Sequence, residues 1–230
     1  MIYEYLIFNI IVLSGPLLLG WLKPFYFLNR WPKVLASAVL VSIPYLVWDS
    51  LVTGLHWEFN FHYTTGLVVL NLPIEEILFF ITVPAACLFT WEMISRRMDE
   101  KPVSFMNRIR PLFYLLPVAG TILFKYGKQY TGLATFFLGL AVALDQVIKT
   151  NLLLQKRFMF FFALSLLFTL VFNGYLTWRP VVVYNELYQL DLRIFTIPVE
   201  DFWYGFSMIY FNTILYEKFR TRKSGSLKLA

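Results

Sequence analysis

Two pairs of adjacent acidic residues, Glu75 with Glu76 and Glu200 with Asp201, begin long apolar stretches of the chain. A carboxyl group inside a bilayer costs about 2.5–3.5 kcal/mol at a helix centre and less near the interface, so such residues are functional by default. If acids from the two pairs meet in a dry interior, they cannot all stay ionised, and a carboxyl that keeps its proton can act as a Brønsted acid. The pattern therefore predicts acid–base chemistry within a membrane.

A structural alternative exists for each pair. Pro73 and Pro198 lie two residues before the first acid, and proline is favoured at the first position of a helix. Acids in a first helical turn also suit the positive end of the helix dipole. Because neighbouring residues on a helix point about 100° apart, one acid of each pair is expected to face the interior and the other a loop or the headgroups.

The two acidic motifs belong to an internal repeat with a constant offset of 125 residues. Asparagine and proline are 13 residues apart in both copies, and the proline precedes a final glutamate by 19 residues. So many polar positions in register indicate a duplication. The paired positions are Phe59/Tyr184, Asn60/Asn185, Tyr63/Tyr188, Pro73/Pro198, Glu75/Glu200, Glu76/Asp201 and Glu92/Glu217.

Other polar residues near the acids are weaker candidates. Asn60, Tyr63, Asn185 and Tyr188 lie in the preceding loops, where they can orient the carboxylates. The alternative is a turn asparagine and an interfacial tyrosine, and it is favoured for the tyrosines. Asp49, which follows Trp48, aligns with Asn173 if one residue is inserted, whereas Asp145 is interpreted as an interfacial or packing acid.

Aromatic residues make up 20% of the chain and surround the acids. Most are expected to contact lipid or to form interfacial belts, but rings beside the acids can stabilise a developing carbocation by cation–π attraction. The candidates are Trp48, Trp57, Phe79, Phe80, Phe202, Trp203 and Tyr204. His56 and His62 lack further metal ligands nearby, so we expect no metal, and no phosphate-binding or dinucleotide motif supports ATP-driven or hydride-transfer chemistry.

Composition indicates an all-α, polytopic membrane protein. Hydrophobic residues account for 59% of the 230 residues and charged residues for 15%, with a mean hydropathy of +0.63. The N-terminal apolar run lacks a basic region and a cleavage site, so it is interpreted as a retained span. About seven spans are expected, of which the fourth is short and contains Pro117 and Gly120; their approximate ranges are 2–22, 34–52, 72–94, 110–125, 131–148, 157–175 and 196–217.

The loop charges predict the orientation of these spans. With seven spans, 16 of the 20 basic residues fall on one side, which the positive-inside rule assigns to the cytoplasm, with the N-terminus outside. The net charge of +6 therefore reports membrane topology and not a nucleic-acid partner. Both acidic pairs then lie near the outer ends of their helices, as in a parallel repeat. The expected organisation is a first repeat at 1–105, a spacer helix at 106–128, a second repeat at 129–220 and a basic cytoplasmic tail at 221–230.

The motifs resemble those of the integral-membrane lycopene cyclases. Residues 71–76 (Asn-Leu-Pro-Ile-Glu-Glu) and 196–204 (Thr-Ile-Pro-Val-Glu-Asp-Phe-Trp-Tyr) carry this resemblance, each after an Asn-x-x-Tyr loop. In that family two homologous three-helix units act as a heterodimer or are fused in one chain. A similar domain is the cyclase part of fungal bifunctional phytoene synthase/lycopene cyclases. The resemblance covers nearly the whole chain.

The resemblance implies redox-neutral, acid-catalysed cyclisation of the ψ end groups of lycopene to β-ionone rings, without flavin or any other cofactor. It implies Glu75, Glu76, Glu200 and Asp201 as the acids and bases. It also implies a lipophilic carotenoid substrate that enters from membrane lipid, and contacts with other carotenoid-pathway enzymes. We expect a multi-pass protein of a bacterial cytoplasmic membrane.

Two alternatives belong to other functional classes. A proton- or ion-coupled transporter would also use paired intramembrane acids in a repeat, but it predicts polar residues across the whole membrane depth. An assembly or scaffold protein explains neither the acids nor their register. Genes for phytoene synthase and desaturase beside this one would favour the cyclase.

Overall fold

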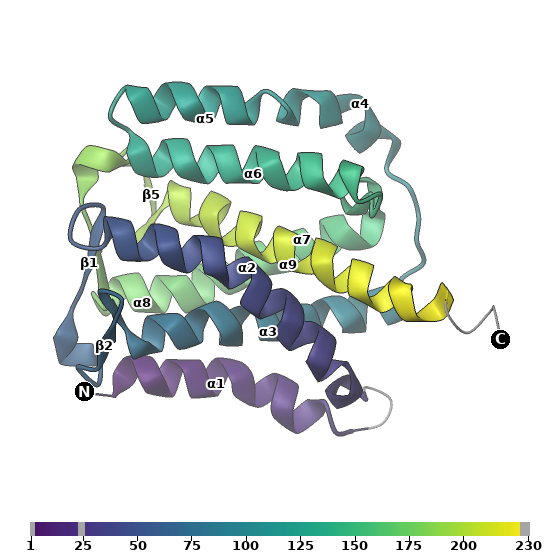
Figure 1. Cartoon of the computed structure of the whole chain (residues 1–230), viewed down its shortest axis with the longest axis horizontal. Coiled ribbons are helices and arrows are strands. Elements are labelled where there is room, and N and C mark those ends of the chain that lie inside the picture. The colour runs from purple at the N-terminus through teal and green to yellow at the C-terminus, as the bar shows by residue number, and fades with distance from the viewer. Residues whose placement is uncertain (1–2, 23–25, 226–230) are drawn as a thin grey trace.

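The computed structural model describes residues 3–22 and 26–225 as a mostly helical protein whose helices lie side by side. Figure 1 shows the short strands gathered at one end of these helices, the end at which α3 and α9 both begin. The first repeat supplies α1 (Glu4–Leu19), α2 (Trp31–Val52) and α3 (Ile74–Arg97). The second supplies α6 (Gln129–Val147), α7 (Lys156–Phe168), the π-helical turn η4 (Thr169–Asn173), α8 (Gly174–Trp178) and α9 (Val199–Gly225).

Four helical segments are long and apolar enough to cross a membrane, by length and composition, within the described ranges. They indicate a multi-pass membrane protein, and α1 is a shorter apolar helix beside them. Because α9 is helical to Gly225, the start of the expected tail is helical, and residues 226–230 lie outside the described residues. The four segments are Phe27–Val52, Ile74–Arg97, Gln129–Val147 and Lys156–Trp178.

The expected single spacer helix is instead two ten-residue helices, α4 (Ser104–Phe113) and α5 (Leu116–Lys125). Pro117 lies in the first turn of α5, where proline starts a helix well. Helix α5 packs closely on α6 through facing glycines, since a Cβ on Gly120 would lie 2.5 Å from the carbonyl oxygen of Gly132. The spacer therefore covers α6 from outside the pair of repeats, as Figure 1 shows.

The all-α expectation is corrected by short strands in the loops. Strands β1 (Trp57–Phe59) and β4 (Val182–Tyr184) pair antiparallel, with Trp57 opposite Tyr184 and Phe59 opposite Val182. Because 57 and 182, and 59 and 184, are related by the 125-residue offset, each repeat makes the same contact to the other. The remaining short elements are β2 (Val68–Val69), β3 (Leu72–Pro73), β5 (Arg193–Ile194), β6 (Ile197–Pro198), η1 (Phe27–Arg30), η2 (Phe61–Tyr63), η3 (Leu152–Leu154) and η5 (Glu186–Tyr188).

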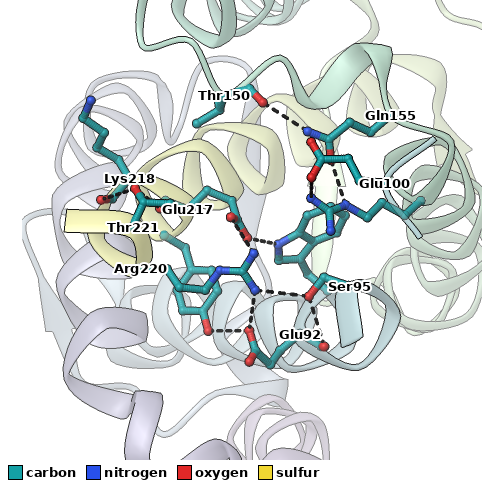
Figure 2. Close-up of polar contacts among 12 residues, drawn as sticks. Glu92, Ser95, Glu100, Thr150, Gln155, Glu217, Lys218, Arg220 and Thr221 are labelled. Atoms are coloured by element: carbon teal, nitrogen blue, oxygen red, sulfur yellow. Dashed lines mark hydrogen bonds and ion pairs between the residues drawn. The ribbon is translucent and has the colours of Figure 1, made fainter. Parts of the chain in front are cut away.

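A second reciprocal contact joins α3 and α9 at their far ends. The indole N–H of Trp91 donates to Glu217 Oε1 at 2.7 Å, and the hydroxyl of Tyr216 donates to Glu92 Oε2 at 2.8 Å. Trp91 and Tyr216 are again 125 residues apart. Figure 2 shows Arg220 between the two carboxylates, 2.8 Å from Glu217 and 3.5 Å from Glu92. Glu92 also pairs with Arg96 and lies 3.7 Å from Arg30.

Replacing Glu92 by glutamine is expected to destabilise the protein by about 1–3 kcal/mol, because half-buried guanidinium groups lose their buried counter-ion. Thermal unfolding of detergent-solubilised protein measures this change. The matched control is Glu58→Gln, since Glu58 is exposed on β1. A normal unfolding temperature for Glu92→Gln together with lost product formation would contradict the structural role.

Candidate functional site

The acidic motifs are positioned by tight hairpins that lead directly into α3 and α9. Strand β2 turns into β3 through Leu70 and Asn71, both with positive φ, as a two-residue hairpin requires. The amide of Asn71 anchors this turn by donating to the carbonyl of Thr53 at 3.1 Å. The chain then enters α3 after Pro73, so both acids of the motif fall in the first helical turn. The hairpin β5–β6 does the same for α9.

A cavity of about 290 Å³ begins beside this first turn and runs into the protein interior. Its lining combines apolar and aromatic side chains with three buried carboxyl groups, and no lysine, arginine or histidine lines it in the described part of the chain. The three carboxyl groups are those of Asp49, Glu76 and Asp201. The cavity is therefore apolar along most of its length and acidic at one end.

The first acid of each pair, Glu75 or Glu200, does not line the cavity but accepts a hydrogen bond from the backbone of the preceding loop. Glu75 accepts the backbone N–H of Thr65 at 2.6 Å, and Glu200 accepts that of Leu190 at 2.7 Å. Thr65 and Leu190 are 125 residues apart, so the contact is repeated in both halves. Glu200 also accepts the hydroxyl of Thr131 at 2.6 Å. Both acids are fully buried, and their contacts match the structural alternative considered for the motif.

In the first half of the site, the carboxyl groups of Glu76 and Asp49 are buried and line the same end of the cavity. The hydroxyl of Tyr5 donates to Glu76 Oε2, and the indole N–H of Trp57 donates to Asp49 Oδ1 at 2.7 Å. Two carboxyl groups in one buried, apolar site do not both ionise, because desolvation and like charge disfavour the second negative charge. This pair is therefore suited to hold a transferable proton.

In the second half of the site, Asp201 is surrounded by hydrogen-bond donors. Its Oδ1 accepts from the hydroxyl of Tyr130, and its Oδ2 accepts from Tyr184 at 2.7 Å and from the amide of Asn173 at 2.6 Å. Burial and the neighbouring Asp201 carboxylate raise the pKa of Tyr184 well above its usual value, so this phenol stays protonated. Three donors favour an ionised carboxylate at Asp201.

The two halves are related by the repeat but differ at one position. Tyr5 and Tyr130 are 125 residues apart and make the same bond to Glu76 and Asp201. Asn173 occupies the place of Asp49 after a shift of one residue. The π-helical turn Thr169–Asn173 ends at this position, whereas α2 remains α-helical through Asp49. One half of the site thus holds a carboxyl pair and the other a carboxylate with an amide.

Of the predicted aromatic residues, Trp57, Phe79 and Tyr204 line the cavity, whereas Phe80 and Phe202 are buried outside its lining. Trp48 lies behind Tyr204, with ring centroids 4.8 Å apart, and Trp203 packs in the core outside the lining. Phe79 and Tyr204 are the rings placed to face a cation near the acids.

The predicted loop residues lie away from the carboxylates. The side chains of Asn60 and Asn185 accept the backbone N–H groups of His62 and Leu187, which caps the turns η2 and η5. Asn185 also donates to the carbonyl of Leu55 at 3.0 Å. These contacts are those of turn asparagines, the alternative considered for Asn60 and Asn185.

The loop tyrosines are also occupied elsewhere. The guanidinium of Arg179 lies 5.1 Å from the ring centroid of Tyr63, and the ring of Tyr188 packs against that of His56 with centroids 4.7 Å apart. Burial lowers the pKa of His56, which bonds to Gln129 at 3.0 Å. Within residues 3–22 and 26–225 no three His, Cys, Asp or Glu side chains gather as metal ligands do. No residue of the site is assigned to a metal or cofactor.

Four residues that contact the acids are not among the predicted site residues: Tyr5, Tyr130, Asn173 and Tyr184. Tyr5 and Tyr130 share the 125-residue offset and precede the acids by 71 residues, so extending the repeat to the N-terminus would have identified them. Tyr184 is a repeat position to which the sequence assigns no role, and Asn173 is the residue that aligns with Asp49. The contacts of both depend on how the chain folds.

Comparison with known proteins matches a family model, described as lycopene cyclase, to residues 2–94 and 127–219. The second segment begins and ends 125 residues after the first, so the model matches each repeat once and leaves out the spacer. No curated protein and no solved structure matches the chain.

Proposed function

We propose that this chain, which belongs to the lycopene cyclase family, is a lycopene β-cyclase that converts the ψ end groups of lycopene to β-ionone rings. The observation that carries the proposal is the apolar cavity that ends at Asp49, Glu76 and Asp201. Membership of an enzyme family and a site with a proton-holding pair and a separate carboxylate both favour acid–base catalysis. A carotenoid hydrocarbon would find apolar walls along the rest of the cavity.

The proposed reaction begins with proton transfer from the Glu76–Asp49 pair to C2 of the end group, which leaves a tertiary cation at C1. The π electrons of the C5=C6 bond attack C1, so the C1–C6 bond forms and the positive charge moves to C5. Loss of the C6 proton to Asp201 restores the double bond and yields the β ring. One proton enters and one leaves, so the product is an isomer of the substrate. The dry cavity protects the cation from water.

Aromatic rings and fixed dipoles support the charged intermediate. Phe79 and Tyr204 line the cavity near the acids and offer negative ring faces to the cation. Asp201, held by three donors, supplies a fixed negative charge close to the reaction and costs little reorganisation. The proton is returned to the Glu76–Asp49 pair through the site or its solvent edge before the next turnover.

The proposal includes the membrane arrangement. Seven spans, with the N-terminus outside and the C-terminus in the cytoplasm, put the acidic end of the cavity near the outer interface. The repeats at 1–105 and 129–220 each contribute one carboxyl half to the site. The substrate then arrives from membrane lipid, supplied by the other carotenoid-pathway enzymes.

Expression in lycopene-accumulating bacteria tests the proposal. The expected result is a change of the cells from red to orange-yellow, with γ-carotene and then β-carotene in the extracted pigments. Verified membrane expression with unchanged lycopene would contradict the assignment of lycopene as the substrate. A ring isomer other than β would keep the cyclase and overturn only the product.

A further inference from the structure

The cavity extends far from the acids, along one side of the protein only. It follows α3 from Glu76 to Thr90, a rise of ~21 Å for fourteen residues of helix. Its other walls come from α1, down to Gly15 and Pro16, from α7 with η4, and from α9 between Tyr204 and Ile209. We call this α1–α3–α7 extension of the cavity the slot. Gly15 lines the inner end of the slot, and a Cβ built on it would meet no atom within 4 Å.

In the second repeat, larger side chains occupy positions equivalent to slot residues. Adding 125 to the slot residues Val12, Gly15 and Ala86 gives Phe137, Leu140 and Phe211. The ring of Phe137 lies 5.3 Å from that of Trp48, 5.5 Å from Tyr45 and 6.4 Å from Phe211. None of these three larger residues lines the cavity. The duplication therefore keeps both acidic halves but leaves open only one of two equivalent slots.

Among residues 3–22 and 26–225, no second carboxyl group lines the inner end of the slot. The nearest acid of α3 beyond Thr90 is Glu92, which is paired with Arg220 (Figure 2). Glu92 also pairs with Arg96 and accepts from the hydroxyl of Tyr216. A carboxylate held by two guanidinium groups stays ionised. Protons can therefore be delivered only at the Glu76 end of the slot.

We propose, resting on the function proposed above, that the slot is the binding site of the polyene chain and that Gly15 and Ala86 determine how long a chain it accepts. One end group reaches the acids while the rest of the molecule lies along α1, α3 and α7. A two-ended substrate is therefore cyclised one end at a time. The monocyclic product leaves the slot and re-enters in the opposite direction before the second ring forms.

The test introduces residues of the second repeat at the equivalent positions of the slot. Gly15→Leu and Ala86→Phe introduce the residues found at the equivalent positions 140 and 211, and both are expected to lower lycopene conversion at least tenfold. The matched control is Leu140→Phe, which adds bulk at the equivalent of Gly15 outside the cavity and is expected to convert lycopene normally. Pigment chromatography gives the conversion, and thermal unfolding in detergent verifies the fold of each variant.

A binding measurement separates the slot from the chemistry. The inactive Glu76→Gln protein, purified from lycopene-accumulating cells, is expected to carry lycopene, which its polyene absorption reports. Adding Ala86→Phe should lower the bound lycopene at least tenfold, whereas adding Leu140→Phe should not. Unchanged binding and conversion in the slot variants, with an active wild type, would overturn the slot alone. A wild type that converts no lycopene would overturn the proposed function together with it.

The order of the two cyclisations has its own test. Labelled lycopene is given to the wild-type protein in vesicles, followed by a large excess of unlabelled lycopene. Release between the two steps predicts that labelled γ-carotene accumulates and that labelled β-carotene falls at least fivefold relative to a sample without the excess. Undiminished labelled β-carotene would show that the intermediate stays bound, which contradicts separate binding events.

Discussion

Replacing Glu76 by glutamine is expected to lower lycopene cyclisation by about 10²–10⁴-fold, the usual contribution of a general acid. Glutamine has nearly the same shape and still accepts from the hydroxyl of Tyr5, so the protein should fold. It cannot share a proton with Asp49 or deliver one to carbon. The rate of product formation per folded protein, measured in vesicles loaded with lycopene, is the decisive quantity.

The matched control is the neighbouring substitution Glu75→Gln. Glu75 lies outside the cavity and fastens Thr65, so its loss should destabilise the fold by about 1–3 kcal/mol and leave the rate per folded protein within a fewfold of normal. The opposite ranking, with Glu75 essential for the rate and Glu76 dispensable, would refute the assignment of the second acid to the chemistry.

The difference between these neighbours shows what the sequence could and could not predict. Adjacent positions on a helix point about 100° apart, so one acid of each pair was expected to face inward and the other a loop. Which acid lines the cavity and which binds the loop depends on the hairpin before each helix. It also depends on the positions of Thr65 and Leu190, whose backbone N–H groups donate to the first acid of each pair. Periodicity alone contains no information on those loop contacts.

The repeat was predictable because its signal is local in sequence and doubled. Its offset of 125 residues recurs in the strand pairing, in the Tyr5 and Tyr130 contacts and in the reciprocal bonds of Trp91 and Tyr216. The partnership of Asp49 with Glu76 was less accessible, since it joins two helices whose rotation no pattern reports. The one-residue shift at Asn173 lies where the second repeat forms a π-helical turn and the first repeat an α-helix.

Apolar segments predicted the helices well but not their interruptions. The spacer was expected as one helix, yet the turn residues Tyr114 and Leu115 divide it into two short helices. Short strands within the motif loops were also missed, because two- and three-residue ladders leave no alternating pattern in the sequence. Whether the slot is open depends on the size of side chains at packed positions. Ala86 lines the slot, whereas Phe211, its equivalent in the second repeat, does not line the cavity.

Replacing Asp201 by asparagine is expected to lower the rate by about 10²–10³-fold and to change the product. The three donors around this position, from Tyr130, Tyr184 and Asn173, would lose the carboxylate that accepts them. The cation at C5 would then lack the fixed base that removes the C6 proton. Protons would also be lost from C4 or from the methyl carbon at C5, which gives ring isomers other than β.

The ratio of ring isomers distinguishes a base from a merely structural acid. Loss of folded protein lowers all products equally and leaves their ratio unchanged, which is the expectation for the control Glu200→Gln, since Glu200 binds Leu190 and Thr131 outside the cavity. Chromatography of the pigments formed by Asp201→Asn therefore decides the role. Residual product that is entirely the β isomer would mean that another group takes the proton, and Asp201 would then serve only to stabilise the cation by its charge.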